Sequence, residues 1–169
     1  MSKPPLMTVL VDTREQCVPP FPPGVTLERR MLKEGDYSTP LLADVARIER
    51  KSVCDFASTL SWGRQRFERE LDRLRALRWK CVVVEGEITQ VYRVSAMHPH
   101  SVLGSIASLT ARWDCPVLFV GNEAACGRVM AGLLRRWEER YLADAIPSVP
   151  QSSPSEEAAL VAAADEALA

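Results

Sequence analysis

Two carboxylates and one ammonium group are spaced as phosphodiester hydrolysis would require. Asp36 follows a glycine, and Glu49 and Lys51 come after a spacer of twelve residues. On an extended strand Glu49 and Lys51 point to the same side, whereas Arg50 points to the other. Mg²⁺ and Mn²⁺ prefer carboxylate oxygens, and such an ion can orient a water and neutralise charge on a phosphate. A lysine beside it can stabilise the transition state.

Spacing alone leaves a second interpretation open. Acidic residues at strand ends are common, and these three charges could equally form surface ion pairs that contribute little to stability. Asp12, at the end of a strand predicted over residues 7–11, is a further acidic candidate. Whether these side chains lie close together depends on the strands and helices that carry them.

A basic segment follows this motif. Residues 64–80 hold seven basic and three acidic side chains, a net charge of +4. On a helix, Arg66, Arg69 and Arg73 share a face, next to an apolar stripe. With Arg64, they form either a ridge that contacts DNA phosphates or a solvated face braced by ion pairs.

The pattern of apolar residues predicts an α/β fold. Strands are expected over residues 7–11, 25–32, 44–50, 81–85 and 116–120, and residues 35–37 form a turn or the start of a strand. Helices are expected from residue 52, over 65–79, over 99–113 and over 122–141, the first opened by a capping box of Ser52 and Asp55. The second half reads strand–helix–strand–helix and predicts parallel pairing, whereas the first three long strands could pair antiparallel. The sum is a mixed central sheet flanked by helices.

Composition limits the class of protein. The chain has 169 residues, 47% of them hydrophobic and 25% charged, which suits one globular domain. Its net charge of −1 argues against a globally basic nucleic-acid binder, though not against a local basic face. It contains no apolar run of membrane-spanning length and no signal-peptide pattern, so we expect an intracellular protein with no membrane partner. The five scattered cysteines indicate buried thiols rather than a zinc site or disulfides.

Residues 146–169 differ from the rest of the chain. Prolines and serines alternate at first, and an alanine-rich acidic stretch follows. We expect a domain over residues 1–145, then a linker and a tail that is either disordered or a short helix.

Five segments carry a further pattern: Val11-Asp12-Thr13-Arg14-Glu15, Gly35-Asp36-Tyr37, Ile48-Glu49-Arg50-Lys51-Ser52-Val53-Cys54-Asp55-Phe56, Ser61-Trp62-Gly63-Arg64-Gln65-Arg66-Phe67 and Val83-Val84-Glu85-Gly86. Together these segments resemble the nuclease domain of the XPF/Hef family, whose signature is Gly-Asp, a spacer and Glu-Arg-Lys-x-x-x-Asp. They follow one another in the family's order over about residues 8–140.

The resemblance implies a restriction-endonuclease-like PD-(D/E)XK core that cleaves branched DNA with Mg²⁺ or Mn²⁺. By the same resemblance, Asp36, Glu49 and Asp12 would bind metal, and Lys51 would position the attacking water or contact the phosphate. Arg50 belongs to the same catalytic set, and Arg14 and Glu15 would line the site. Asp55 would hold Arg50 or Lys51 in place, although helix capping alone explains it.

The chain also departs from the family. Trp62-Gly63 stands where Asp-Gly is usual, and the family's tandem helix-hairpin-helix domain is absent from the sequence. Two alternatives therefore stay open, a non-catalytic DNA-binding or scaffolding module and a nuclease without junction preference. A separate subunit could deliver the DNA, and the apolar surplus of the helix over 124–141 could form a homodimer. His98 and His100 make a poor metal site and suit a loop or a cap.

Overall fold

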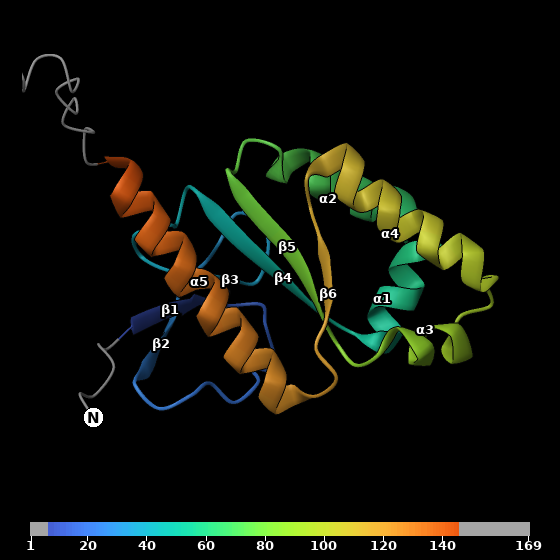
Figure 1. Cartoon of the computed structure of the whole chain (residues 1–169), viewed down its shortest axis with the longest axis horizontal. Helices are drawn as coiled ribbons and strands as arrows, with labels where there is room; N and C mark the ends of the chain where they lie inside the picture. The colour runs from blue at the N-terminus through green and yellow to red at the C-terminus, as the bar shows by residue number, and fades with distance from the viewer. Residues whose placement is uncertain (1–6, 146–169) are drawn as a thin grey trace, which may run out of the picture. The chain divides into compact units, whose positions relative to one another are not determined.

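The computed structural model describes residues 7–145, of which residues 7–139 fold around one mixed sheet (Figure 1). The strand order is β2-β1-β3-β4-β5-β6. The bounds are β1 Met7–Val11, β2 Val25–Arg29, β3 Tyr37–Ser38, β4 Ala46–Ser52, β5 Trp79–Glu85 and β6 Val117–Phe119. The mixed α/β class predicted from the sequence is confirmed.

The strand directions correct one prediction. β4, β5 and β6 pair parallel, as the alternating second half indicated. β1 and β2 also pair parallel, whereas an antiparallel arrangement was expected for the first strands. The short β3 lies between β1 and β4 and pairs antiparallel with both. Because β3 lies between them in the sheet, β1 and β4 do not pair directly.

Helices cover both faces of this sheet. One face packs against α1 Val53–Leu60, α2 Arg64–Leu74, α3 Ile88–Val94 and α4 Pro99–Trp113, and the other against α5 Glu123–Ala145. Alternate residues of β5 divide between the two cores. Val82 and Val84 belong to the core with α1 to α4, while Cys81 and Val83 belong to the core with α5. A strand buried on both faces reads as the continuous apolar run seen in the sequence.

Local capping follows the sequence closely. The Ser52 side chain caps α1 by accepting from the backbone of Asp55, and His98 caps α4 in the same way. Asn122 Oδ1 accepts from the backbone of Ala125 at the start of α5. The cap predicted at Ser52 is confirmed, and of the two roles left open for His98 the structure shows the cap.

Three expectations were wrong. The helix predicted to residue 79 ends at Leu74, because Trp79 begins β5 and pairs with Ala46. The helix α3 was not predicted. Cys17 and Cys54 are exposed, while the remaining three thiols are buried as expected.

No helix within residues 7–145 is long and apolar enough to cross a membrane. The linker and tail predicted over residues 146–169 lie outside the described part of the chain.

Candidate active site

Asp36 and Glu49 line one pocket of about 200 Å³. Asp36 immediately precedes β3 and Glu49 lies in β4, and the backbone NH of Asp36 donates to the carbonyl of Ile48 at 2.9 Å. Strand pairing thus places two carboxylates thirteen positions apart in the sequence side by side. The pairing of these two acids predicted from their spacing is confirmed.

A glycine sets the direction of the Asp36 backbone. Gly35 has φ +71°, a conformation that favours glycine. A Cβ atom there would also lie 2.8 Å from Cγ of Arg47, too close for a side chain. Beyond this turn, Oδ2 of Asp36 accepts a hydrogen bond from the backbone NH of Arg50 at 2.8 Å. The backbone turn that orients Asp36 therefore explains why a glycine precedes this aspartate in the motif.

Burial and nearby negative charges make both carboxylates harder to ionise. Burial raises the pKa of Asp36 to about 8, and the charge of Glu49 adds to that rise. Burial likewise raises the pKa of Glu49, and the charge and hydrogen bond of Lys51 offset only part of this effect. Two buried acids without enough internal positive charge are arranged to attract a cation.

Lys51 lies beside this pair. Its Nζ donates to Oε1 of Glu49 at 2.9 Å and lies 4.8 Å from the centre of the Phe67 ring. Only 12% of its side chain is exposed. The ammonium group is therefore held in a partly dry position next to the carboxylates, on the side of β4 that strand alternation predicts.

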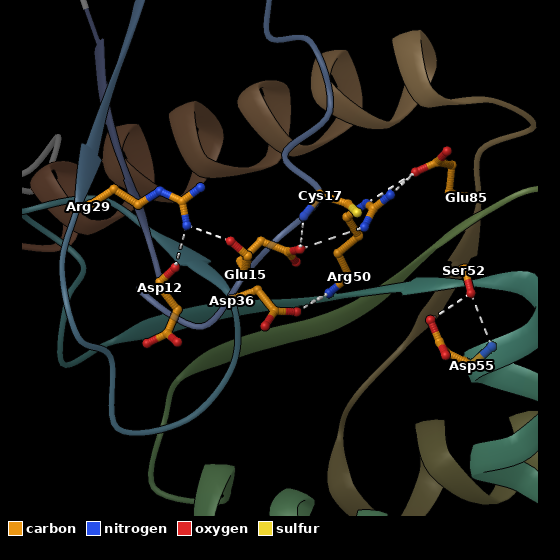
Figure 2. A network of polar contacts seen from close by, with 9 residues as sticks. All are labelled: Asp12, Glu15, Cys17, Arg29, Asp36, Arg50, Ser52, Asp55 and Glu85. Atoms are coloured by element: carbon orange, nitrogen blue, oxygen red, sulfur yellow. Dashed lines mark hydrogen bonds and ion pairs between the residues drawn. The ribbon is translucent and has the colours of Figure 1, made fainter.

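Arg50 belongs to a different network, shown in Figure 2. Its guanidinium forms an ion pair with Glu85 at the end of β5, and a longer one of 3.8 Å with Glu15. All three side chains are mostly buried. This network ties the loop after β1 to the ends of β4 and β5, and so fixes the backbone NH that binds Asp36.

Asp12 is fully buried but does not line the pocket of Asp36 and Glu49. Its Oδ1 accepts from the backbone NH and Nε of Arg14, at 2.9 and 2.6 Å, and its Oδ2 accepts from the backbone NH of Leu32 at 2.7 Å. Burial opposes its ionisation, but these bonds outweigh burial, so the pKa of Asp12 lies below its ordinary value. Both oxygens are already occupied by donors from the protein.

Asp55 takes part in the cap of α1. Its Oδ2 accepts from the Ser52 hydroxyl at 2.6 Å, and its backbone NH donates to the same hydroxyl at 3.1 Å (Figure 2). The ion pairs of Arg50 and Lys51 go to other acids. Asp55 does line a second pocket together with Lys51.

The predicted DNA-contacting arginines separate into groups. Arg14 and Arg66 line the pocket of the carboxylates. Arg73 forms an ion pair with Glu34, and Arg64 pairs with Glu68 and donates to the Ser105 hydroxyl. Arg69 is exposed on α2.

Two acids in the pocket were missed by the sequence analysis, Glu34 and Glu70. Glu70 lies on α2 one turn after Phe67 and Arg66, so helical spacing was a signal that could have found it. Among residues 7–145, no group of three or more acidic, histidine or cysteine side chains is close enough to hold a metal ion. Of the four acids that line the pocket, Asp36 and Glu49 are the two that the sequence analysis expected to bind a metal ion. This pair suits Mg²⁺, which is commonly bound through one or two carboxylates and keeps its other positions for waters and phosphates.

A mixed sheet with helices on both faces and an acidic pair beside a lysine defines a restriction-endonuclease-like nuclease core. Residues 11–133 match the model of the ERCC4 domain, and the chain belongs to that family. None of the curated protein sequences compared with the chain matches it.

Two solved structures support the same fold. The XPF from Aeropyrum pernix in complex with DNA is 24% identical, with a TM-score of 0.65 over 89% of this chain and 70% of that one. A second structure, described as XPF from Aeropyrum pernix, is also 24% identical, with a TM-score of 0.64 over 84% of this chain and 75% of that one. The resemblance drawn from the motifs, to an XPF-type nuclease domain, is confirmed.

Proposed function

We propose that this chain is a divalent-metal-dependent endonuclease that hydrolyses phosphodiester bonds in branched DNA. One observation carries the proposal: Asp36 and Glu49 share a pocket where burial and nearby negative charges disfavour their charge, and Lys51 is fixed beside them. Membership of the ERCC4 domain family supports DNA as the substrate, and one of the solved structures with this fold is described as a complex with DNA.

Asp36 and Glu49 would hold Mg²⁺ or Mn²⁺. The ion, when bound, supplies a positive charge for the phosphate and lowers the pKa of a water. The backbone NH of Arg50 orients the Asp36 carboxylate by binding its Oδ2. The network of Arg50 with Glu85 and Glu15 keeps that NH in place.

Lys51 supplies the second positive charge. Because its ammonium group is held by Glu49 and the Phe67 ring, it can reach a phosphate oxygen without a large loss of side-chain freedom. Its charge stabilises the negative charge that develops on the phosphate oxygens as the nucleophile attacks. Arg14 and Arg66, on the wall of the same pocket, contact neighbouring phosphates.

The test is cleavage of labelled fork, flap, four-way and linear duplex DNA of matched sequence, in Mg²⁺, Mn²⁺ or EDTA. We expect cuts close to the junction, none in EDTA, and a loss of at least about 100-fold in Lys51→Ala. Glu139→Gln, which removes an exposed carboxylate on α5 that pairs with Arg136, is the matched control and should cut like the unmodified chain.

Three results would contradict the proposal in different ways. Tight binding of branched DNA without cleavage in either metal would indicate a non-catalytic DNA-binding module. Equal cleavage of linear and branched DNA would remove the junction preference but keep the chemistry. Full activity of Lys51→Ala would show that the reacting site lies elsewhere.

A further inference from the structure

The turn between α1 and α2 presents an exposed tryptophan. Trp62 is 86% exposed, more than any other large hydrophobic side chain of residues 7–145. It stands at the position where the sequence departs from the Asp-Gly of the family resemblance. A large apolar side chain placed in water at this point is not explained by the core or by the carboxylate pocket.

The backbone holds this tryptophan in a fixed position. The NH of Gly63 donates to the carbonyl of Ser58 at 3.0 Å, and the Ser61 hydroxyl donates to the carbonyl of Ala57 at 3.0 Å. The turn lies so close to the end of α1 that a Cβ on Gly63 would approach the Ser58 oxygen to 3.1 Å. Trp62 is therefore an exposed side chain on an ordered turn. Because the backbone is already ordered, binding a partner costs little conformational entropy in the turn.

Trp62 also lines two pockets. The first, of about 320 Å³, has Lys51, Arg66 and Phe67 on its wall. The second, of about 280 Å³, is bounded by α1 and the end of α3. Arg66, Phe67 and Glu70 line both the first of these pockets and the pocket of Asp36 and Glu49. The pocket beside the indole and the pocket of the carboxylates are therefore neighbours with a shared wall.

The composition of the first pocket indicates what could bind there. Beside the indole it offers two cationic groups, Lys51 and Arg66, two carboxylates, Asp55 and Glu70, and the polar side chains of Ser58 and Thr59. Glu70 pairs with Arg66 at 3.3 Å, and 83% of the Arg66 side chain stays exposed. A protein partner would require a broader apolar surface around the tryptophan. One flat aromatic face with cationic groups nearby fits a nucleotide, whose base stacks while its phosphate meets the cations.

We propose that Trp62 stacks against an unpaired base of the DNA strand whose phosphate is to be cleaved beside the pocket of Asp36 and Glu49. The inference rests on the proposed function and adds how the site recognises its substrate. In duplex DNA the faces of each base are already covered by its neighbours, whereas an unpaired base at a fork or flap has a face to offer. Trp62 therefore favours single-stranded arms over continuous duplex.

The test measures binding separately from cleavage. Asp36→Asn in the full chain, in EDTA, is titrated with a fluorescein-labelled fork carrying single-stranded arms and with the fully paired duplex of the same sequence. Trp62→Ala and Trp62→Phe are added on this background. Leu103→Ala, which removes an exposed apolar side chain on α4 outside these pockets, is the matched control.

Stacking of one base predicts that Trp62→Ala weakens binding of the fork by about 5- to 150-fold and changes duplex binding by less than twofold. Trp62→Phe should retain most of the fork affinity, because a phenyl ring still stacks, and Leu103→Ala should match its parent. Fork binding should also quench tryptophan emission, and this quenching should be lost in Trp62→Phe. Because Trp62 contributes little to the core, thermal melting of all variants should agree.

Equal losses for fork and duplex, or no loss in Trp62→Ala, would overturn the stacking role. If the unmodified chain cleaves forked DNA in Mg²⁺ while Trp62→Ala binds the fork normally, only this inference fails. If the unmodified chain binds neither DNA and cleaves neither, the proposed function fails as well.

Discussion

Asp12 is buried and Asp36 is partly buried, and although a backbone hydrogen bond joins them, their carboxylates behave in opposite ways. The NH of Asp12 donates to the carbonyl of Asp36 at 2.8 Å, so the two residues lie at the same edge of the sheet. Burial opposes the charge of both. The pKa of Asp12 nevertheless lies below its ordinary value, while that of Asp36 is raised to about 8.

The difference lies in their partners. Asp12 receives three hydrogen bonds from Arg14 and Leu32, which stabilise its charge within the protein. Asp36 receives one from the NH of Arg50 and faces the charge of Glu49. A buried acid that is neutralised internally holds the fold together, whereas one that is left uncompensated is available to an external cation.

The largest expected effect separates the two acids by activity. Asp36→Asn should lower cleavage of forked DNA by at least about 100-fold, because the variant lacks the negative charge that would hold the metal. Asp12→Asn should retain activity within a few-fold once the fraction of folded protein is taken into account. The measurement is single-turnover cleavage in Mg²⁺, with folded fractions from circular dichroism. Comparable losses in both variants would break the comparison and return Asp12 to the reacting site.

The second effect concerns stability, for which Asp12 matters more than Asp36. Asp12→Ala leaves the buried NH of Leu32 without its acceptor, and we expect the free energy of unfolding to fall by about 2–3 kcal/mol. Glu28→Ala removes an exposed ion pair with Arg30 and should cost about 0–1 kcal/mol. Urea unfolding at pH 7 measures both.

The same carboxylate has a pH dependence of known sign. Because its folded pKa is depressed, Asp12 stabilises the fold above its unfolded pKa of about 3.8, and this contribution is lost as the pH falls through the lower folded value. The gap between the unmodified chain and Asp12→Ala should therefore narrow below pH 4. An unchanged gap at low pH would mean that the ionised carboxylate is not what stabilises the fold.

The third prediction concerns the metal-free site. The carboxyl of Asp36 ionises near 3.8 when unfolded and at about 8 when folded. Between these values the folded chain keeps a proton that the unfolded chain has lost, so stability in EDTA should fall as the pH rises from about 4 to about 8. Urea midpoints across this range should show a shallower slope in Asp36→Asn. Mg²⁺ should counteract the decline, since it binds the ionised carboxylate; identical slopes in both proteins would contradict the uncompensated state of Asp36.

The sequence predicted the relative placement of Glu49 and Lys51 better than it predicted the residues around them. Strand alternation alone placed Glu49 and Lys51 on one side of β4, and the hydrogen bond between them confirms it. It could not separate Asp12 from Asp36, because the donor that occupies the second carboxylate oxygen of Asp12 is the NH of Leu32, twenty residues away. Only tertiary structure decides where such a donor lies.

The errors in the fold have the same origin. Residues 75–79 have good helical spacing, but Trp79 pairs with Ala46 and begins β5, so residues 75–78 form the connection between α2 and that strand. β3 has two residues, too few for a periodic signal, and its insertion changes which strands pair. Glu85 was not recognised as the partner of Arg50, since that ion pair depends on the parallel register of β4 and β5.

The smallest expected effect concerns Asp55, which lies on the border between the two kinds of acid. Its carboxylate binds the Ser52 hydroxyl in the cap of α1, as a structural acid would, yet it lines a pocket with Lys51. If capping is its role, Asp55→Ala should cost about 1 kcal/mol of stability and change cleavage by less than about threefold. Ser52→Ala removes the other half of the cap and should have a similar effect on urea unfolding. A loss of cleavage in Asp55→Ala far beyond that of Ser52→Ala would show that Asp55 acts on Lys51, and would place it with Asp36 rather than with Asp12.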